Sequence, residues 1–169
     1  RDGTSVAAAG TRRLRSWARR WAPSSWEHHL YGQAEADPRL DFDGAVLPED
    51  AGLDPRHAVR CTPSSHRHLR ALLDAVPVRA TDAILDVGCG KGSAMRVMLD
   101  YPFARVDGVE LGASIAETAR RNFARLQVPY TRCQVHTADA AAFDALDGYT
   151  HAYLYNPFSI EVLRGFLSQ

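Results

Sequence analysis

The residues with the clearest capacity for chemistry form a glycine-rich loop, Asp86-Val87-Gly88-Cys89-Gly90-Lys91-Gly92. A short apolar run, 83–87, leads into this loop, and the pattern of residues 93–100 predicts a helix directly after it. Glycines at a strand–helix turn allow a sharp bend and let the backbone approach a ligand without a clash from Cβ. The N-terminus of the following helix adds free N–H groups. The loop therefore predicts a ligand site with an acid, Asp86, at its start.

The spacing of the loop discriminates between possible ligands. A dinucleotide fingerprint, G-x-G-x-x-G, requires glycine at position 93, where this chain has Ser93. A phosphate-binding G-x-x-x-x-G-K-[ST] loop cannot be drawn around Lys91, because Gly92 follows it. Glu110 closes the next predicted strand, and a carboxylate at that place can accept hydrogen bonds from both hydroxyls of a ribose.

The elements that must position these residues alternate between strand and helix. Apolar runs predict strands over 83–87, 106–110, 130–135 and 151–155, and helical spacing predicts helices over 93–100, 114–126 and 159–166. This alternation predicts a doubly wound α/β fold with a mostly parallel sheet. Ser114-Ile115-Ala116-Glu117 has the form of a capping box, and Ser159 is suited to cap the last helix.

The part of the chain before the first predicted strand consists of three segments of different composition. Six arginines and a Trp-containing apolar face over 1–22 predict an amphipathic helix, which either packs on the main domain or contacts nucleic acid or an acidic membrane. Residues 32–63, rich in proline and acids, predict a connecting loop draped over a site. A helix then begins near Ser64 or Ser65, and its predicted buried face consists of Leu69, Leu72, Leu73 and Val76.

Composition limits the class of protein. A chain of 169 residues that is 46% hydrophobic and 24% charged is typical of one soluble globular domain. Its formal net charge of zero argues against binding to nucleic acid through overall charge, and three cysteines favour a reducing compartment. No apolar run is long enough to span a bilayer, so we expect a cytoplasmic protein. The first residue is Arg1 rather than methionine, which we interpret as a sign of a fragment.

The segment Ile84–Gly92 resembles the first motif of class I S-adenosylmethionine (SAM)-dependent methyltransferases, which have a Rossmann-like fold. The resemblance implies that the glycine loop, with Cys89 in it, runs beneath the methionine part of SAM while Asp86 holds its amino group. It implies that Glu110 binds the ribose. It also places Asp139, with Ala140 beside it, at the adenine amino group.

The methyl acceptor is assigned by the same resemblance to the segment Asn156-Pro157-Phe158, which follows the fourth predicted strand. Asn156 and Phe158 are the candidate catalytic residues. The chain lacks the second proline of the Asn-Pro-Pro motif found in some amino methyltransferases. Its spacing is also similar to that of non-SET histone-lysine methyltransferases, which places Ser64 near the methionine end of SAM. Three substitutions relative to those enzymes, at Cys61, Thr62 and Pro157, argue against a chromatin substrate.

Several other side chains have less specific roles. His66, His68 and His151 are candidate bases, and no metal-ligand pattern is present in the sequence. Tyr153 and Tyr155 point to one face of the fourth predicted strand, where we expect both to be buried.

The resemblance implies a partial methyltransferase fold with strand order 3-2-1-4. We predict a SAM-binding domain over 61–169 that is incomplete at its C-terminus, preceded by an extension over 1–60. The predicted function is methyl transfer from SAM, by direct displacement, to an unidentified small-molecule or protein-amine acceptor. The alternatives are a non-catalytic SAM-fold binding module and, less favoured, a nucleotide-binding oxidoreductase.

Overall fold

The computed structural model describes residues 38–55, 58, 60–64, 66–155, 157 and 159–167, with the side chains of residues 161 and 162 left out. The predicted arginine-rich helix and the two candidate catalytic residues, Asn156 and Phe158, lie outside the described residues. The chain from Arg39 onward forms one compact unit, and the description below concerns that unit.

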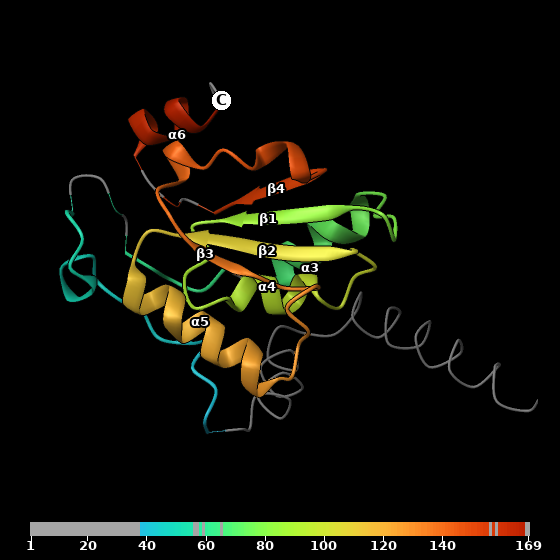
Figure 1. The fold of residues 1–169 in the computed structure, drawn as a ribbon, viewed down its shortest axis with the longest axis horizontal. Coiled ribbons are helices and arrows are strands. Elements are labelled where there is room, and N and C mark those ends of the chain that lie inside the picture. Colours follow the sequence, from blue (N-terminus) through green and yellow to red (C-terminus); the bar gives the residue numbers. More distant parts are fainter. Residues whose placement is uncertain are drawn as a thin grey trace, which may run out of the picture. The chain divides into compact units, whose positions relative to one another are not determined.

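A parallel sheet of four strands forms the centre of this unit, in the order β3-β2-β1-β4 (Figure 1). The strands are β1 (Ala83–Val87), β2 (Arg105–Glu110), β3 (Val135–Thr137) and β4 (His151–Leu154). All residues of β1 are buried, as expected for a central parallel strand with both faces covered. The predicted fold class and strand order are therefore confirmed.

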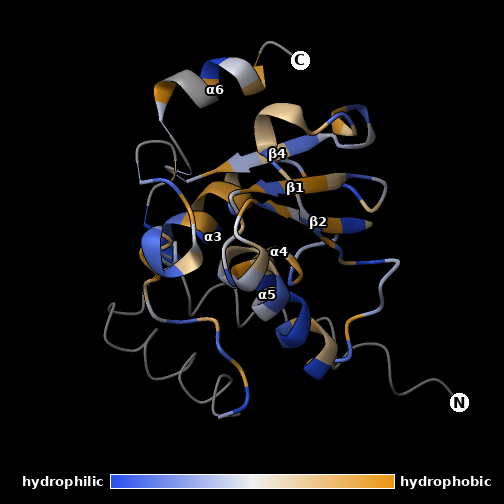
Figure 2. Ribbon diagram, turned by 60° about the vertical axis from the view of Figure 1, so that its left-hand side comes forward, coloured by the Kyte–Doolittle hydropathy of each residue, from blue (hydrophilic) through white to orange (hydrophobic). Residues whose placement is uncertain are grey.

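Side chains alternate along each strand, so apolar side chains point to both faces of the sheet, and helices cover both faces. Ile84 and Val106 pack in one cluster with α3 (His66–Ala75), α4 (Ser93–Met98) and α5 (Ala113–Arg125). Leu85 and Val109 pack in a second cluster with Phe166 of α6 (Ile160–Leu167). Figure 2 shows the hydrophobic colour of this interior along β1 and on α4.

Two predicted boundaries in the second half of the domain are wrong. The third strand was expected over 130–135, but Arg132 and Cys133 donate their N–H groups to the Pro129 carbonyl in a turn, and β3 begins at Val135. The proposed capping box does not form either. Helix α5 begins one residue earlier, at Ala113, with Gly112 at its N-cap and no side-chain cap.

Two further local predictions are also wrong. Ser159 precedes α6, but its buried hydroxyl has no hydrogen-bond partner and therefore does not cap the helix. On α3, Leu69 and Leu73 are buried as expected, whereas Leu72 is 53% exposed and Val76 is 38% exposed. The buried stripe of this helix is therefore narrower than its apolar pattern suggests.

The acidic connecting segment packs onto the domain. We call residues 39–64 the roof segment; residues 56, 57 and 59 within it are not described. Phe42 is buried in the first core cluster, and Val46 and Cys61 form an antiparallel bridge through two N–H···O bonds of 3.1 and 3.0 Å. A short 3-10 helix, η1 (Glu49–Ala51), lies between them. Phe42 thus anchors the start of the segment in the core, and the bridge joins Val46 to Cys61 within the segment.

Candidate functional site

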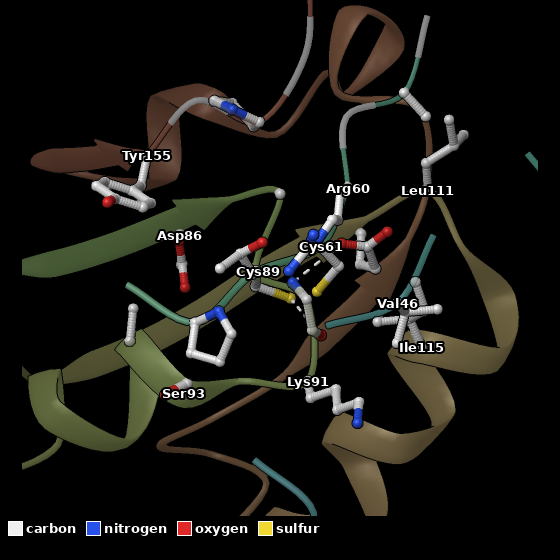
Figure 3. Close-up of a pocket in the computed structure, with 18 of the residues that line it drawn as sticks. Val46, Arg60, Cys61, Asp86, Cys89, Lys91, Ser93, Leu111, Ile115 and Tyr155 are labelled. Atoms are coloured by element: carbon white, nitrogen blue, oxygen red, sulfur yellow. Dashed lines mark hydrogen bonds between the residues drawn. The ribbon is translucent and has the colours of Figure 1, made fainter. Parts of the chain in front are cut away.

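A cavity of about 500 Å³ lies where the parallel strands end (Figure 3). Its lining comes from the glycine loop after β1, from Glu110 at the end of β2 and Leu111 after it, from Asp139 and Ala140 after β3, and from the roof segment. Open α/β sheets bind ligands in the crevice at the carboxyl ends of their strands. The structure therefore brings the predicted site residues of three strands to one cavity.

The glycine loop has a backbone that favours glycine. Gly88 and Gly90 have φ angles of 74° and 56°, in the left-handed region that residues with a Cβ rarely adopt. A Cβ at Gly88 would lie 2.5 Å from the Pro157 Cβ, and one at Gly90 would lie 2.6 Å from the Cys61 sulfur. The loop is therefore in close contact with both the segment after β4 and the roof segment.

The Glu110 carboxylate connects the loops after β1 and β2. Its Oε2 accepts a hydrogen bond of 3.0 Å from Gly90 N–H, and its Oε1 accepts one of 2.8 Å from Gly112 N–H. Burial raises the pKa of Glu110, while the backbone N–H groups of Gly112, Gly90 and Leu111 oppose the rise. Each carboxylate oxygen has a second lone pair, so the side chain retains capacity to accept bonds from a ligand.

Asp86 is a buried acid in β1, directly before its last residue, Val87. Its side chain is 3% exposed and accepts no hydrogen bond from any described residue. Burial, and secondarily the charge of Glu110, raise its pKa to about 8. A carboxyl group held neutral in a cavity gains from a cationic partner, and such perturbed groups concentrate at functional sites.

Two cysteines lie on the cavity wall, one on the glycine loop and one on the roof segment. The Cys89 thiol is buried and donates a 3.7 Å hydrogen bond to the Gly90 carbonyl. Burial raises its pKa well above the ordinary value, and Asp86 adds to the rise. Burial also raises the pKa of Cys61. Neither thiol has the lowered pKa of a nucleophile, so Cys89 contributes its small volume to the wall.

The remaining predicted cofactor residues are also on the cavity wall. Asp139 is exposed, and its Oδ1 accepts a 2.9 Å bond from Ala141 N–H at the start of the 3-10 helix η2 (Ala140–Ala142). Ala140 is buried beside it. Ser64 lines the cavity from the roof segment and lies beside the hydroxyl of Tyr153.

The candidate bases and the two tyrosines divide into groups near the cavity and away from it. His66 Nε2 lies 2.8 Å from the hydroxyl of Ser93, a cavity residue. His68 is exposed on α3, and His151 packs against Phe103 at the beginning of β4, the opposite end of the strand from the cavity. His66 is therefore the histidine of the three that contacts the cavity wall.

Tyr155 was expected to be buried, but it is 51% exposed and lines the cavity. Its strand ends at Leu154, so the side chain emerges at the carboxyl edge of the sheet instead of under a helix. Tyr153 is partly buried against the core, in keeping with the prediction.

Two residues that were not among the predicted site residues connect the site to the roof. Lys91 binds Asp41, and Asn122 of α5 binds the backbone of both. The available signal was that Lys91 is the only lysine in the chain, placed inside the glycine loop. Asn122 carries no comparable signal, because a polar residue on an amphipathic helix is normally exposed.

Comparison with known proteins agrees with this geometry. A family model described as a methyltransferase domain matches residues 84–164. An uncharacterized methyltransferase of Mycobacterium tuberculosis is 35% identical over 82 residues, which cover 47% of this chain and 41% of that protein. Trans-aconitate 2-methyltransferase of Paracidovorax citrulli is 28% identical over 100 residues, covering 59% of this chain and 36% of that protein. The chain thus spans about two fifths of the length of these curated relatives.

Solved structures show the fold. The glycopeptide N-methyltransferase MtfA, complexed with sinefungin, aligns with a TM-score of 0.52 and 19% identity over 64% of this chain and 44% of that one. The methyltransferase domain of a bacterial CtHen1 aligns with a TM-score of 0.50 and 20% identity, over 59% of this chain and 55% of that one. The chain therefore has the Rossmann-like fold of class I methyltransferases. More particularly, residues 84–164 match the methyltransferase-domain model, in agreement with the resemblance of Ile84–Gly92.

The described residues lack two further features. Within these parts of the chain, no helix is long and apolar enough to cross a membrane. The same residues contain no group of three histidine, cysteine or acidic side chains placed to hold a metal ion.

Proposed function

We propose that the protein is a SAM-dependent methyltransferase that transfers a methyl group by direct displacement to a small-molecule or protein-amine acceptor. The observation that carries this proposal is the set of three carboxylates around one glycine loop. Asp86 near the end of β1, Glu110 at the end of β2 and Asp139 after β3 all line one cavity. Their order corresponds to the amino group, the ribose and the adenine of SAM.

The charges in the cavity support a cationic cofactor. Asp86 has no hydrogen bond from described residues, and a cationic group beside it would offset the burial and the Glu110 charge that raise its pKa. Lys91, the basic residue of the glycine loop, is already paired with Asp41 at 2.6 Å. A pyrophosphate would therefore meet carboxylates and a neutralised lysine, which disfavours the oxidoreductase alternative.

The chain's residues would mainly bind and orient. SAM, when bound, supplies a methyl group already activated by its sulfonium, so the protein needs chiefly to align the acceptor and exclude water. Glu110 would hold the ribose hydroxyls, and the roof segment would cover the cofactor. Tyr155 and Pro157 line the cavity after β4, where we place the acceptor, with Asn156 and Phe158 as the residues that orient it.

Calorimetric titration of the 169-residue chain with SAM, S-adenosylhomocysteine (SAH) and NAD tests the proposal. We expect heat with SAM and SAH and none with NAD. Heat with NAD alone would replace this proposal with the oxidoreductase. Binding of SAM without methyl release from labelled SAM, across a panel of amine and carboxylate acceptors, would favour the non-catalytic binding module.

We also propose a cytoplasmic location for the protein and consider nucleic acid as a partner of its first residues. All three cysteines are free thiols, which supports a reducing, cytoplasmic compartment. The arginines of residues 1–20 are the feature that supports nucleic-acid binding, for which affinity must fall steeply with salt. We favour packing of that segment on protein over a nucleic-acid role.

The raised pKa of Asp86 predicts a pH dependence of cofactor binding. The group is neutral at low pH, and an ammonium group beside it favours ionisation, so SAH affinity should increase from about pH 6 to about pH 8. Isothermal titration of the wild type and Asp86→Asn over this range measures the effect. The increase should be absent in the variant. An equal slope in both proteins would show that Asp86 does not face the amino group.

Asp86 also makes the stability of the ligand-free protein depend on pH, in the direction opposite to its effect on SAH affinity. Because the folded protein holds the Asp86 proton up to a pKa of about 8, whereas the unfolded chain releases it near its ordinary value, the free energy of unfolding without ligand falls as pH rises between these values. Asp86→Asn should remove this contribution in urea unfolding at several pH values. A slope that persists unchanged would assign the loss of stability to other groups.

A further inference from the structure

The roof segment is attached to the glycine loop through Asp41 and Lys91. The Lys91 ammonium donates a 2.6 Å hydrogen bond to the Asp41 carboxylate and a 2.8 Å bond to the Asp43 carbonyl. The lysine side chain is 13% exposed and the Asp41 side chain 55% exposed. The backbone of Lys91 is thus part of the glycine loop, while its ammonium group binds the roof segment.

Asn122 strengthens this attachment from α5. Its side chain is fully buried; its Oδ1 accepts a 2.9 Å bond from Asp41 N–H, and its Nδ2 donates to the Asp41 carbonyl at 2.7 Å. Nδ2 also lies 3.1 Å from the Lys91 carbonyl and donates to it. The Asn122 amide therefore hydrogen-bonds to backbone groups of both the roof segment and the glycine loop.

The neighbouring aromatic contact holds the roof in the same place. Phe42 is 4% exposed and packs edge-to-face on Phe123, with ring centroids 5.9 Å apart. Phe42, Gly44 and Val46 all line the cavity. Movement of this part of the roof would therefore change the walls of the cavity directly.

We propose that Asp41, Lys91 and Asn122 are positioning residues that hold the roof segment closed over the cofactor and so limit the rate at which it leaves. The inference rests on the proposed function, since it takes SAM or SAH as the ligand. Closing the roof removes water from the cavity, and opening it requires separation of the ion pair and of the Asn122 amide from the Asp41 backbone. The ion pair is the part that substitution can remove without disturbing the core.

A matched pair of variants isolates the ion pair. Asp41→Asn removes the carboxylate that binds Lys91, whereas Asp43→Asn makes the same change of charge at a residue that binds Lys91 only through its carbonyl. We expect Asp41→Asn to raise the dissociation constant for SAH by about threefold, as is typical of a partly exposed pair, and Asp43→Asn to leave it unchanged. Stopped-flow measurement should place the change in the dissociation rate.

Further controls separate positioning from a loss of folding. Asp41→Glu retains the charge and should recover most of the wild-type dissociation rate. The difference between wild type and Asp41→Asn should shrink at high ionic strength, because salt screens an exposed pair. Thermal unfolding without SAH should be similar for both asparagine variants. Equal SAH dissociation rates for Asp41→Asn and Asp43→Asn would overturn the proposal.

Hydrogen exchange of the free protein distinguishes failure of this inference from failure of the proposed function. If the ion pair holds the roof, the peptide covering residues 39–47 should exchange faster in Asp41→Asn than in Asp43→Asn, with or without SAH. Faster exchange without any SAH binding to the wild type would remove the proposed function and leave the attachment standing. Unchanged exchange would remove the attachment itself.

Discussion

Replacing Glu110 by glutamine is expected to weaken SAH binding by at least tenfold. The carboxylate accepts bonds from Gly90 N–H and Gly112 N–H, and the proposed ribose contacts add to these two. A glutamine presents an NH₂ group to one of these donors and loses the negative charge. Hydrogen bonds to charged groups are worth about 1.5–3 kcal/mol each, which corresponds to roughly 10- to 150-fold in affinity. Isothermal titration with SAH measures the change.

The control for this variant is Glu117→Gln, which makes the same substitution on the exposed surface of α5. Glu117 pairs with Arg120 at 3.4 Å, and its side chain is 55% exposed. SAH affinity should be unaltered by this control. If Glu110→Gln binds SAH as tightly as Glu117→Gln does, Glu110 serves only to join the two loops, and the ribose assignment is wrong.

The arrangement of the site was largely predictable because its signals are local and repeated. Each acid lies at or just beyond the carboxyl end of a strand, and parallel strands bring these ends to one edge of the sheet. Asp86, Glu110 and Asp139 consequently line one cavity, as their positions in the sequence implied. The roles given to them toward SAM remain predictions.

The position of the roof was not predictable from local patterns. Asp41 and Asn122 are 81 positions apart, and neither lies in a motif. The sequence indicated an acidic loop over a site. The attachment of this loop, however, depends on the buried Asn122 amide, which hydrogen-bonds to the backbone of both Asp41 and Lys91. Such a contact depends on the tertiary arrangement of α5 and the glycine loop, which periodicity does not specify.

The capping box predicted at Ser114 does not form because a contact of the site determines where α5 begins. Ser114 and Glu117 have the residue types of a cap, but Gly112 N–H is bound to Glu110 and the Gly112 carbonyl accepts from Ala116 N–H. The helix therefore begins at Ala113, and Ser114 falls within its first turn. The carboxylate of the site thus fixes the entry to α5 more strongly than the serine does.

Replacing Asp107 by alanine is expected to lower the free energy of unfolding by about 3–6 kcal/mol, because two hydrogen bonds to a charged acceptor are lost and each is worth about 1.5–3 kcal/mol. Asp107 lies within β2 and is 1% exposed. It accepts a 2.9 Å bond from Gln134 N–H and a 2.8 Å bond from the Tyr149 hydroxyl, and Arg105 lies 2.9 Å from it. Alanine leaves the Gln134 N–H and the Tyr149 hydroxyl without their acceptor and removes the charge that pairs with Arg105.

Urea unfolding measures this loss, with Asp144→Ala as the control at an exposed acid. We expect the control to change the free energy of unfolding by less than about 0.5 kcal/mol, as surface substitutions usually do. Tyr149→Phe removes one donor and leaves the carboxylate paired, so its cost should be about 1.5–3 kcal/mol. A cost for Asp107→Ala no larger than that for Tyr149→Phe would mean that the carboxylate's other two partners contribute nothing. The hydrogen bond from Tyr149 would then account for all of the stabilisation that this acid provides.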